Sequence, residues 1–123
     1  MPGRTTLSTP LHAGESLVLE IPADAAYLTT ARLFVGAAAR HLGIDEETAE
    51  DIKLAVSDAG TGAMDGQVIR LAVRVIGDRA WFELESVGAQ FGELDVVAGL
   101  FEDLTIEPTS AGGVIVRFSV PAD

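Results

Sequence analysis

Three aspartates recur at intervals of seven residues in the segment DIKLAVSDAGTGAMDG, which covers residues 51–66. Residues seven apart share one side of an α-helix, so Asp51, Asp58 and Asp65 would present their carboxylates along a single stripe. Such a stripe either binds a divalent metal through its carboxylate oxygens or faces water, and a run of like charges is more often solvated. We therefore expect no bound metal.

Glycines at positions 60, 62 and 66 share this segment. They do not form a dinucleotide-binding fingerprint, because that motif follows a strand and opens a helix, whereas the residues before Gly60 are helical in pattern. A glycine inside a helix costs about 1 kcal/mol relative to alanine. Gly60 and Gly62 therefore indicate either a frayed helix end or a place where another group comes close to the helix.

The other polar residues do not form a catalytic constellation. The chain has no cysteine, and neither of its two histidines, His12 and His41, has a partner at a recognised metal-ligand spacing. Ser57, Thr61 and Ser86 have no histidine base nearby in the sequence. Hydrolase chemistry is therefore not expected.

The composition indicates one compact domain with a strongly acidic charge. The 123 residues are 48% hydrophobic, and 19 acidic against 8 basic residues give a formal charge of −11. This charge repels a nucleic-acid backbone and steers the protein toward basic protein surfaces, or it serves solubility alone. No apolar run approaches the roughly 18 residues of a membrane helix, and residues 1–15 lack the apolar segment of a signal peptide. We expect a cytoplasmic protein that binds neither nucleic acid nor membrane.

The hydrophobic periodicity places these residues on a small set of elements. Residues 1–15 are expected to be a flexible lead-in and residues 16–123 a single domain, in which Asp24 and Asp45 cap two amphipathic helices. The expected elements are a strand holding Leu17, Leu19 and Ile21; helices with apolar stripes from Leu28 to Leu42 and from Ile52 to Ala63; a strand from Val68 to Val75 that turns at Gly77-Asp78 into one holding Phe82 and Leu84; a short helix over Leu94–Phe101; and strands over Leu104–Glu107 and Val114–Val120.

Hairpin connections and helices with one apolar stripe each favour the α+β class: a two-layer α/β sandwich with helices on one face of a mixed, mostly antiparallel sheet.

Three stretches within this order carry a family resemblance: IPADAAYLTTARLFV, LGIDEETAEDIKLAVSDAGTGAMDG and the C-terminal GGVIVRFSVP. Together they resemble the anti-sigma-factor serine kinases of the GHKL ATPases, over roughly residues 16–121. The resemblance implies the Bergerat, or histidine-kinase-like, ATPase fold. It also implies a site at which the second helix faces the phosphates of a nucleotide.

The positions that would serve a nucleotide depart from the family's pattern. The family places a glutamate and an asparagine four residues apart on the second helix, as general base and magnesium ligand, and the matching residues here are Asp58 and Gly62. The adenine-binding motif Asp-x-Gly-x-Gly corresponds to residues 86–90, SVGAQ, in which Ser86 replaces the aspartate and only Gly88 is retained. Few residues follow before the next helix, so the lid over the phosphates is expected to be shortened.

The resemblance therefore implies a vestigial nucleotide pocket and a surviving docking function. We expect no cofactor, no catalytic residue, and a regulator that binds a sigma factor or a STAS-type anti-anti-sigma protein. The family engages its sigma factor through the first helix, where Arg32 matches an arginine that can pair with a partner carboxylate; an ordinary solvated charge is the alternative. Two other functions stay open: an active serine kinase that uses ATP and magnesium with Asp58 as the base, and an accessory subunit that pairs with an intact kinase paralogue. A homodimer or a heterodimer is compatible with each.

Overall fold

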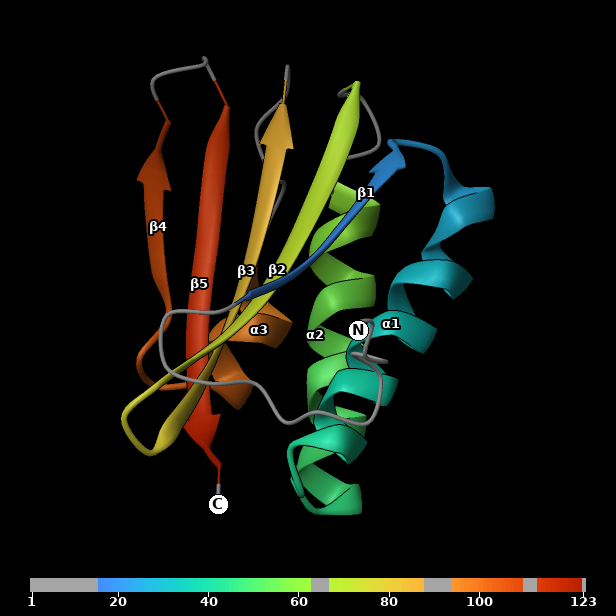
Figure 1. The fold of residues 1–123 in the computed structure, drawn as a ribbon. Helices are drawn as coiled ribbons and strands as arrows, with labels where there is room; N and C mark the ends of the chain where they lie inside the picture. Colours follow the sequence, from blue (N-terminus) through green and yellow to red (C-terminus); the bar gives the residue numbers. More distant parts are fainter. Residues whose placement is uncertain (1–15, 63–66, 88–93, 110–112, 123) are drawn as a thin grey trace, which may run out of the picture.

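The computed structural model describes residues 16–62, 67–87, 94–109 and 113–122. The predicted lead-in, residues 1–15, lies outside the described residues. The elements follow the predicted order with one addition, a 3-10 turn before the first helix (Figure 1). They are β1 (Ser16–Pro22), η2 (Ala25–Tyr27), α1 (Leu28–His41), α2 (Glu46–Gly62), β2 (Val68–Ile76), β3 (Arg79–Val87), α3 (Asp95–Leu100), β4 (Thr105–Pro108) and β5 (Val114–Pro121).

The five strands form one sheet in the order β1-β2-β3-β5-β4. The predicted α+β class is confirmed. The mostly antiparallel sheet is not mixed as predicted, because all four described strand pairings are antiparallel. β2 and β3 are joined by a tight turn in which Gly77 has a φ of +63°, a conformation that favours glycine. The hairpin predicted from the alternation around Gly77-Asp78 is therefore confirmed.

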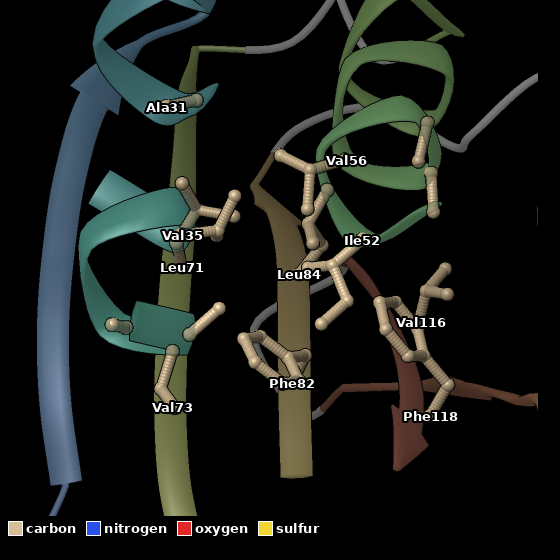
Figure 2. Packing of buried hydrophobic residues seen from close by; sticks show 14 of the residues in the cluster. Ala31, Val35, Ile52, Val56, Leu71, Val73, Phe82, Leu84, Val116 and Phe118 are labelled. Carbon is tan, nitrogen blue, oxygen red and sulfur yellow. The ribbon is translucent and has the colours of Figure 1, made fainter. Parts of the chain in front are cut away.

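The helices cover one face of the sheet, and the hydrophobic core fills the space between the two layers (Figure 1). Alternate strand residues point to this face, so each strand contributes every second side chain to the core. Buried side chains of both layers include Ala31, Val35, Ile52, Val56, Leu71, Val73, Phe82, Leu84, Val116 and Phe118 (Figure 2). The Phe118 ring stacks on Phe82, with centroids 5.7 Å apart, and on Phe101, with centroids 4.1 Å apart. Because Phe101 follows α3 directly, this stack attaches the short helix to the sheet.

The two long helices begin in different ways. Asp24 accepts a hydrogen bond from the Ala26 amide at 2.9 Å and so caps the 3-10 turn η2. The prediction that it caps the first helix is therefore wrong, because that turn intervenes before α1 begins at Leu28. Asp45 caps α2 as predicted: its Oδ1 accepts from the Thr48 amide at 2.8 Å and its Oδ2 from the Thr48 hydroxyl at 3.0 Å. These hydrogen bonds from the Thr48 amide and hydroxyl hold the pKa of Asp45 below its usual range.

In the described part of the chain, no helix combines the length and the apolar character that crossing a membrane requires.

Candidate functional site

A groove runs between α1 and α2 on the side away from the sheet, with a volume of about 660 Å³. The helix residues that face the core, such as Val35 and Val56, lie on the opposite side of the same two helices. The groove is lined by Arg32, Leu33 and Arg40 of α1 and by Lys53, Leu54 and Ser57 of α2, among others. Two amphipathic helices that pack on a sheet leave their outer sides to solvent. The side chains that line this groove are therefore accessible to a binding partner.

Two leucines give the groove an apolar character. Leu33 is 69% exposed and Leu54 is 52% exposed, although both are of a residue type that is normally buried. Each contributes to the same cavity from a different helix. An exposed apolar patch bordered by polar residues is typical of a protein-binding surface.

The groove is also locally basic in a strongly acidic chain. Arg32, Arg40 and Lys53 line it, whereas the whole sequence has 8 basic residues and a formal charge of −11. The one acid in the lining, Glu50, pairs with Lys53 through an Nζ to Oε2 distance of 2.5 Å. A cationic and apolar groove of this kind complements an acidic, amphipathic surface on a partner.

Arg32 is held across the groove by hydroxyl groups. Its Nη1 donates to Ser57 Oγ on α2 at 3.1 Å, and its Nη2 donates to Thr29 Oγ1 one turn earlier on α1 at 3.2 Å. None of the ion pairs found among the described residues includes Arg32. The guanidinium group is therefore oriented, while its positive charge is available to a carboxylate from outside the chain.

The positions matched to a nucleotide site gather at one end of the molecule. Asp58 is partly buried on α2, and Gly62 is the last residue of that helix. Ser86 lies near the end of β3, and Figure 1 shows the C-terminal ends of α2 and β3 at the same end of the fold. The Gln67 amide, just before β2, donates to the Val87 carbonyl at 2.9 Å, which extends the pairing of β2 with β3 to this end of the sheet. The fourth matched position, Gly88, lies outside the described residues.

Ser86 occupies an unusual position for a hydroxyl group. It is 0% exposed, and among the described residues no atom forms a hydrogen bond with its Oγ. Its carbonyl oxygen faces Gly113, where a Cβ would lie only 2.0 Å away. The chain at Gly113 therefore packs directly against the backbone of β3 at the position where the family's pattern has its adenine-binding aspartate.

The structure distinguishes the two explanations for the glycines of α2, a frayed helix end and the close approach of another group, at Gly60. A Cβ on Gly60 would lie 2.8 Å from Leu28 Cδ2, so the residue leaves room for α1 to come close. The helix also continues past it to Gly62. Close approach, and not fraying, is thus the reason for glycine at position 60.

The aspartate stripe does not form a metal site in the part of the chain that the structure describes. There, no group of three His, Asp or Glu side chains is arranged to hold a metal ion. Asp65, the last member of the stripe, lies outside the described residues.

Sequence reasoning identified Arg32 but missed the rest of the groove. Leu33 and Leu54 fall outside the buried stripes of their helices, and an apolar residue away from its stripe is the signal that would have located them. Arg40 and Lys53 gave no such signal, because a charge on a solvated helix face is ordinary.

Comparisons with known proteins agree with this fold. No family model matches the chain. In sequence, the chain is similar to the serine-protein kinase RsbW of Listeria monocytogenes serovar 1/2a (strain ATCC BAA-679 / EGD-e), with 31% identity over 98 residues that cover 67% of this chain and 62% of the relative. In structure, it is similar to the crystal structure of the RsbU and RsbW domains of Rv1364c from Mycobacterium tuberculosis, with a TM-score of 0.73, 19% sequence identity, and coverage of 88% of this chain and 32% of that chain. The chain thus spans less than two thirds of the length of each.

The two-layer fold, with paired helices over one face of an antiparallel sheet, is that of the histidine-kinase-like ATPases. Within this class, the chain belongs to the anti-sigma-factor serine kinase family, to which the RsbW proteins belong.

Proposed function

We propose that this protein is a regulator of the anti-sigma type that binds a sigma factor or a STAS-domain anti-anti-sigma protein, and that it does so without a nucleotide. The observation that carries the proposal is the groove between α1 and α2, in which an oriented Arg32 lies beside the exposed Leu33 and Leu54. A regulator of this kind works in the cytoplasm, where its partners are found.

Docking would use both the apolar side chains and the positive charge of the groove. Burying Leu33 and Leu54 against a partner contributes up to about 1.5–3 kcal/mol for each side chain that becomes fully buried. A partner carboxylate would take over Arg32 from two neutral hydroxyls, and unlike them it could accept two parallel hydrogen bonds from the guanidinium group in a bidentate ion pair. The local positive charge would also steer an acidic partner toward the groove, in spite of the acidic charge of the whole chain.

Independence from nucleotide is supported by the residues at the matched positions. Gly62 has no side-chain oxygen to coordinate magnesium, and Ser86 has a short neutral side chain where an aspartate would accept from adenine. Each of these groups contributes separately to holding and aligning a nucleotide. We therefore propose that no cofactor is required.

Binding measurements with single purified partners test the proposal. The protein is immobilised and exposed to each sigma factor and each STAS-domain protein encoded in its own genome, with no nucleotide present. We expect one of them to bind, and Arg32→Ala and Leu54→Asp to weaken that binding by at least about tenfold. Ile76→Asp is the matched control, since Ile76 is an apolar residue of similar exposure, 55%, at the end of β2. Binding to none of these proteins, or equal losses in Leu54→Asp and Ile76→Asp, would contradict the proposal.

A second function, that of an active serine-protein kinase, is favoured by two observations. Asp58 keeps a carboxylate at the position of the general base, and the similar Listeria protein is named a serine-protein kinase. Phosphate transfer from ATP to a STAS-domain protein, present in the wild type and abolished by Asp58→Asn, would establish the kinase and remove the nucleotide-independent account. An absence of transfer under conditions in which the partner binds would support the first proposal.

A further inference from the structure

The groove between α1 and α2 has two sides that are both helical. On α1 its lining follows one helix face, at spacings of three and four residues, through Thr29, Leu33, Gly36 and Arg40. Backbone groups inside a helix bond to one another, so neither side of the groove offers a row of N–H and C=O groups to an extended segment. A helix satisfies its own backbone groups and can dock here through side chains alone.

Two unneutralised positive charges lie along this groove. Arg32 and Arg40 both line it, and at about 1.5 Å of rise per residue their eight-residue separation on α1 corresponds to about 12 Å along the helix axis. No ion pair found among the described residues includes either arginine. The third cation of the lining, Lys53, is already paired with Glu50. Two arginines therefore have their charges available to carboxylates from outside the chain.

Arginines on the opposite face of the sheet are arranged differently. Arg74 and Arg117 both pair with Glu83, at 3.3 and 2.8 Å. These cations are thus neutralised within the chain, whereas Arg32 and Arg40 are not.

The part of the groove between the two arginines is apolar. On α1 it consists of Leu33, Gly36 and Ala37, and α2 contributes Leu54. A Cβ on Gly36 would lie 3.3 Å from Lys53 Cδ, so the aliphatic part of Lys53 packs against α1 and adds to this apolar surface. An occupant that matches the groove is therefore apolar in its middle and acidic toward both ends.

We propose that the groove binds one amphipathic α-helix, on which two acidic residues lie two turns apart and flank apolar residues. This helix belongs to the sigma factor or STAS-domain protein of the proposed function, on which the inference rests. Acids seven residues apart share one side of a helix and lie about 10.5 Å apart along its axis, close to the separation of Arg32 and Arg40. Arg40 is then the residue that selects the spacing of the two acids.

A designed peptide provides the probe. It is a dye-labelled peptide of about 18 residues, since isolated helices shorter than about 12–15 residues are marginal in water. It consists mainly of alanine and glutamine, with two glutamates seven residues apart and two leucines between them on the same face. The full chain is titrated into this peptide at fixed pH and salt, and the fluorescence anisotropy is recorded. We expect saturable binding in the micromolar range.

Two control peptides test the helix and the spacing. In the first, the second glutamate is exchanged with the residue two positions further on, which moves its carboxylate to the opposite face of the helix. In the second, a central alanine is replaced by proline, which breaks the helix and leaves the charge unchanged. Each control should bind at least about tenfold more weakly than the probe.

Variants of the protein test the role of Arg40. Arg40→Gln should weaken binding of the probe by about tenfold, whereas Arg70→Gln, which removes the same charge from the opposite face of the sheet, should leave it unchanged. Arg40→Glu should bind a peptide in which one glutamate is replaced by lysine more tightly than the wild type does. A purely structural role of this exposed arginine would not give such a rescue.

The outcomes separate this inference from the proposed function. A probe that does not bind saturably, a control peptide that binds as tightly as the probe, or equal losses in Arg40→Gln and Arg70→Gln would overturn the helix. If a sigma factor or STAS-domain protein binds through Arg32 while the probe does not bind, the proposed function stands and the helix is wrong. If the probe binds through Arg40 and none of these proteins binds, the helix stands and the proposed function is wrong.

Discussion

Arg32 on α1 donates a hydrogen bond to Ser57 on α2, and Ser57 is the residue immediately before Asp58. One turn earlier on α1, Leu28 packs against Gly60 of the same α2 segment. The first half of α1 thus lies directly on the part of α2 that carries the matched nucleotide positions. The groove therefore borders the part of α2 that carries Asp58, one of the positions matched to a nucleotide site.

An acidic residue at position 57 should block the groove from within. Ser57→Asp would place a carboxylate beside the Arg32 guanidinium, which would then pair inside the chain and no longer be available to a partner. We expect partner affinity to fall by at least about tenfold while the thermal unfolding midpoint stays close to that of the wild type. Thr30→Asp, which adds the same charge at an exposed position of α1, is the control and should leave affinity nearly unchanged. If both variants lose affinity equally, charge repulsion and not Arg32 controls docking.

Gly60→Ala should destabilise the fold, because the new side chain would collide with Leu28. The new Cβ would lie 2.8 Å from Leu28 Cδ2, the end of a rotatable side chain, so the leucine must shift at the low end of the cost of overpacking, about 1 kcal/mol. Gly99→Ala on α3 is the reference, since a Cβ there meets nothing within 4 Å. In urea unfolding, Gly60→Ala should be less stable than Gly99→Ala by that amount, and it should cost less in a Leu28→Ala background. A cost of Gly60→Ala that is independent of Leu28 would refute the close approach of the two helices.

Alanine at position 113 should be far more damaging. Its Cβ would lie 2.0 Å from the Ser86 carbonyl oxygen, which is a backbone atom of a central strand and has little freedom to move. We expect a loss of at least about 3 kcal/mol in the free energy of unfolding. Gly43→Ala provides the comparison, because Gly43 has a φ of +74° but open space around it, and a left-handed conformation alone costs about 1–2 kcal/mol. A Gly113→Ala protein as stable as Gly43→Ala would contradict this packing of β5 against β3.

The cap of α2 makes stability depend on pH in the acidic range. The pKa of Asp45 is lowered in the folded state by the Thr48 amide and hydroxyl, so its carboxylate favours the folded form above the unfolded pKa. That contribution is lost as the pH falls through the lowered folded-state pKa. The difference in unfolding midpoint between the wild type and Asp45→Ala should therefore be constant near neutral pH and should shrink below about pH 4. Asp45→Asn, a neutral residue that also caps helices, should differ from Asp45→Ala by an amount that does not change with pH. A wild-type advantage over Asp45→Ala that is as large at pH 2 as at neutral pH would rule out this assignment.

Much of the fold follows from local patterns that the sequence displays directly. The alternation around Leu71 and Val73 and the three- and four-residue spacing around Val35 correspond to buried faces in the structure, because burial on one side is what selects those periods. Asp24 was misplaced by one element, since a 3-10 turn and an α-helix can each use the same capping side chain.

The sites depend on residues that are distant in the sequence, and these were harder to predict. Arg32 was found through resemblance, but its bond to Ser57 depends on how α1 and α2 pack, which no local pattern encodes. The contact between Gly113 and Ser86 could not be predicted, because a glycine that a close neighbour requires cannot be told in the sequence from a glycine that a turn requires. The pairing of Glu83 with Arg117 likewise depends on the register of β3 and β5.

Calorimetric titration of the identified sigma factor or STAS-domain partner into the protein tests the central claim most directly. The titration would be run with the wild type and with Arg32→Ala, each without nucleotide and again with ATP and magnesium. The account predicts binding of the wild type that is the same under both conditions, and a loss of at least about tenfold in Arg32→Ala. Binding that requires ATP, or binding that Arg32→Ala leaves intact, would contradict it.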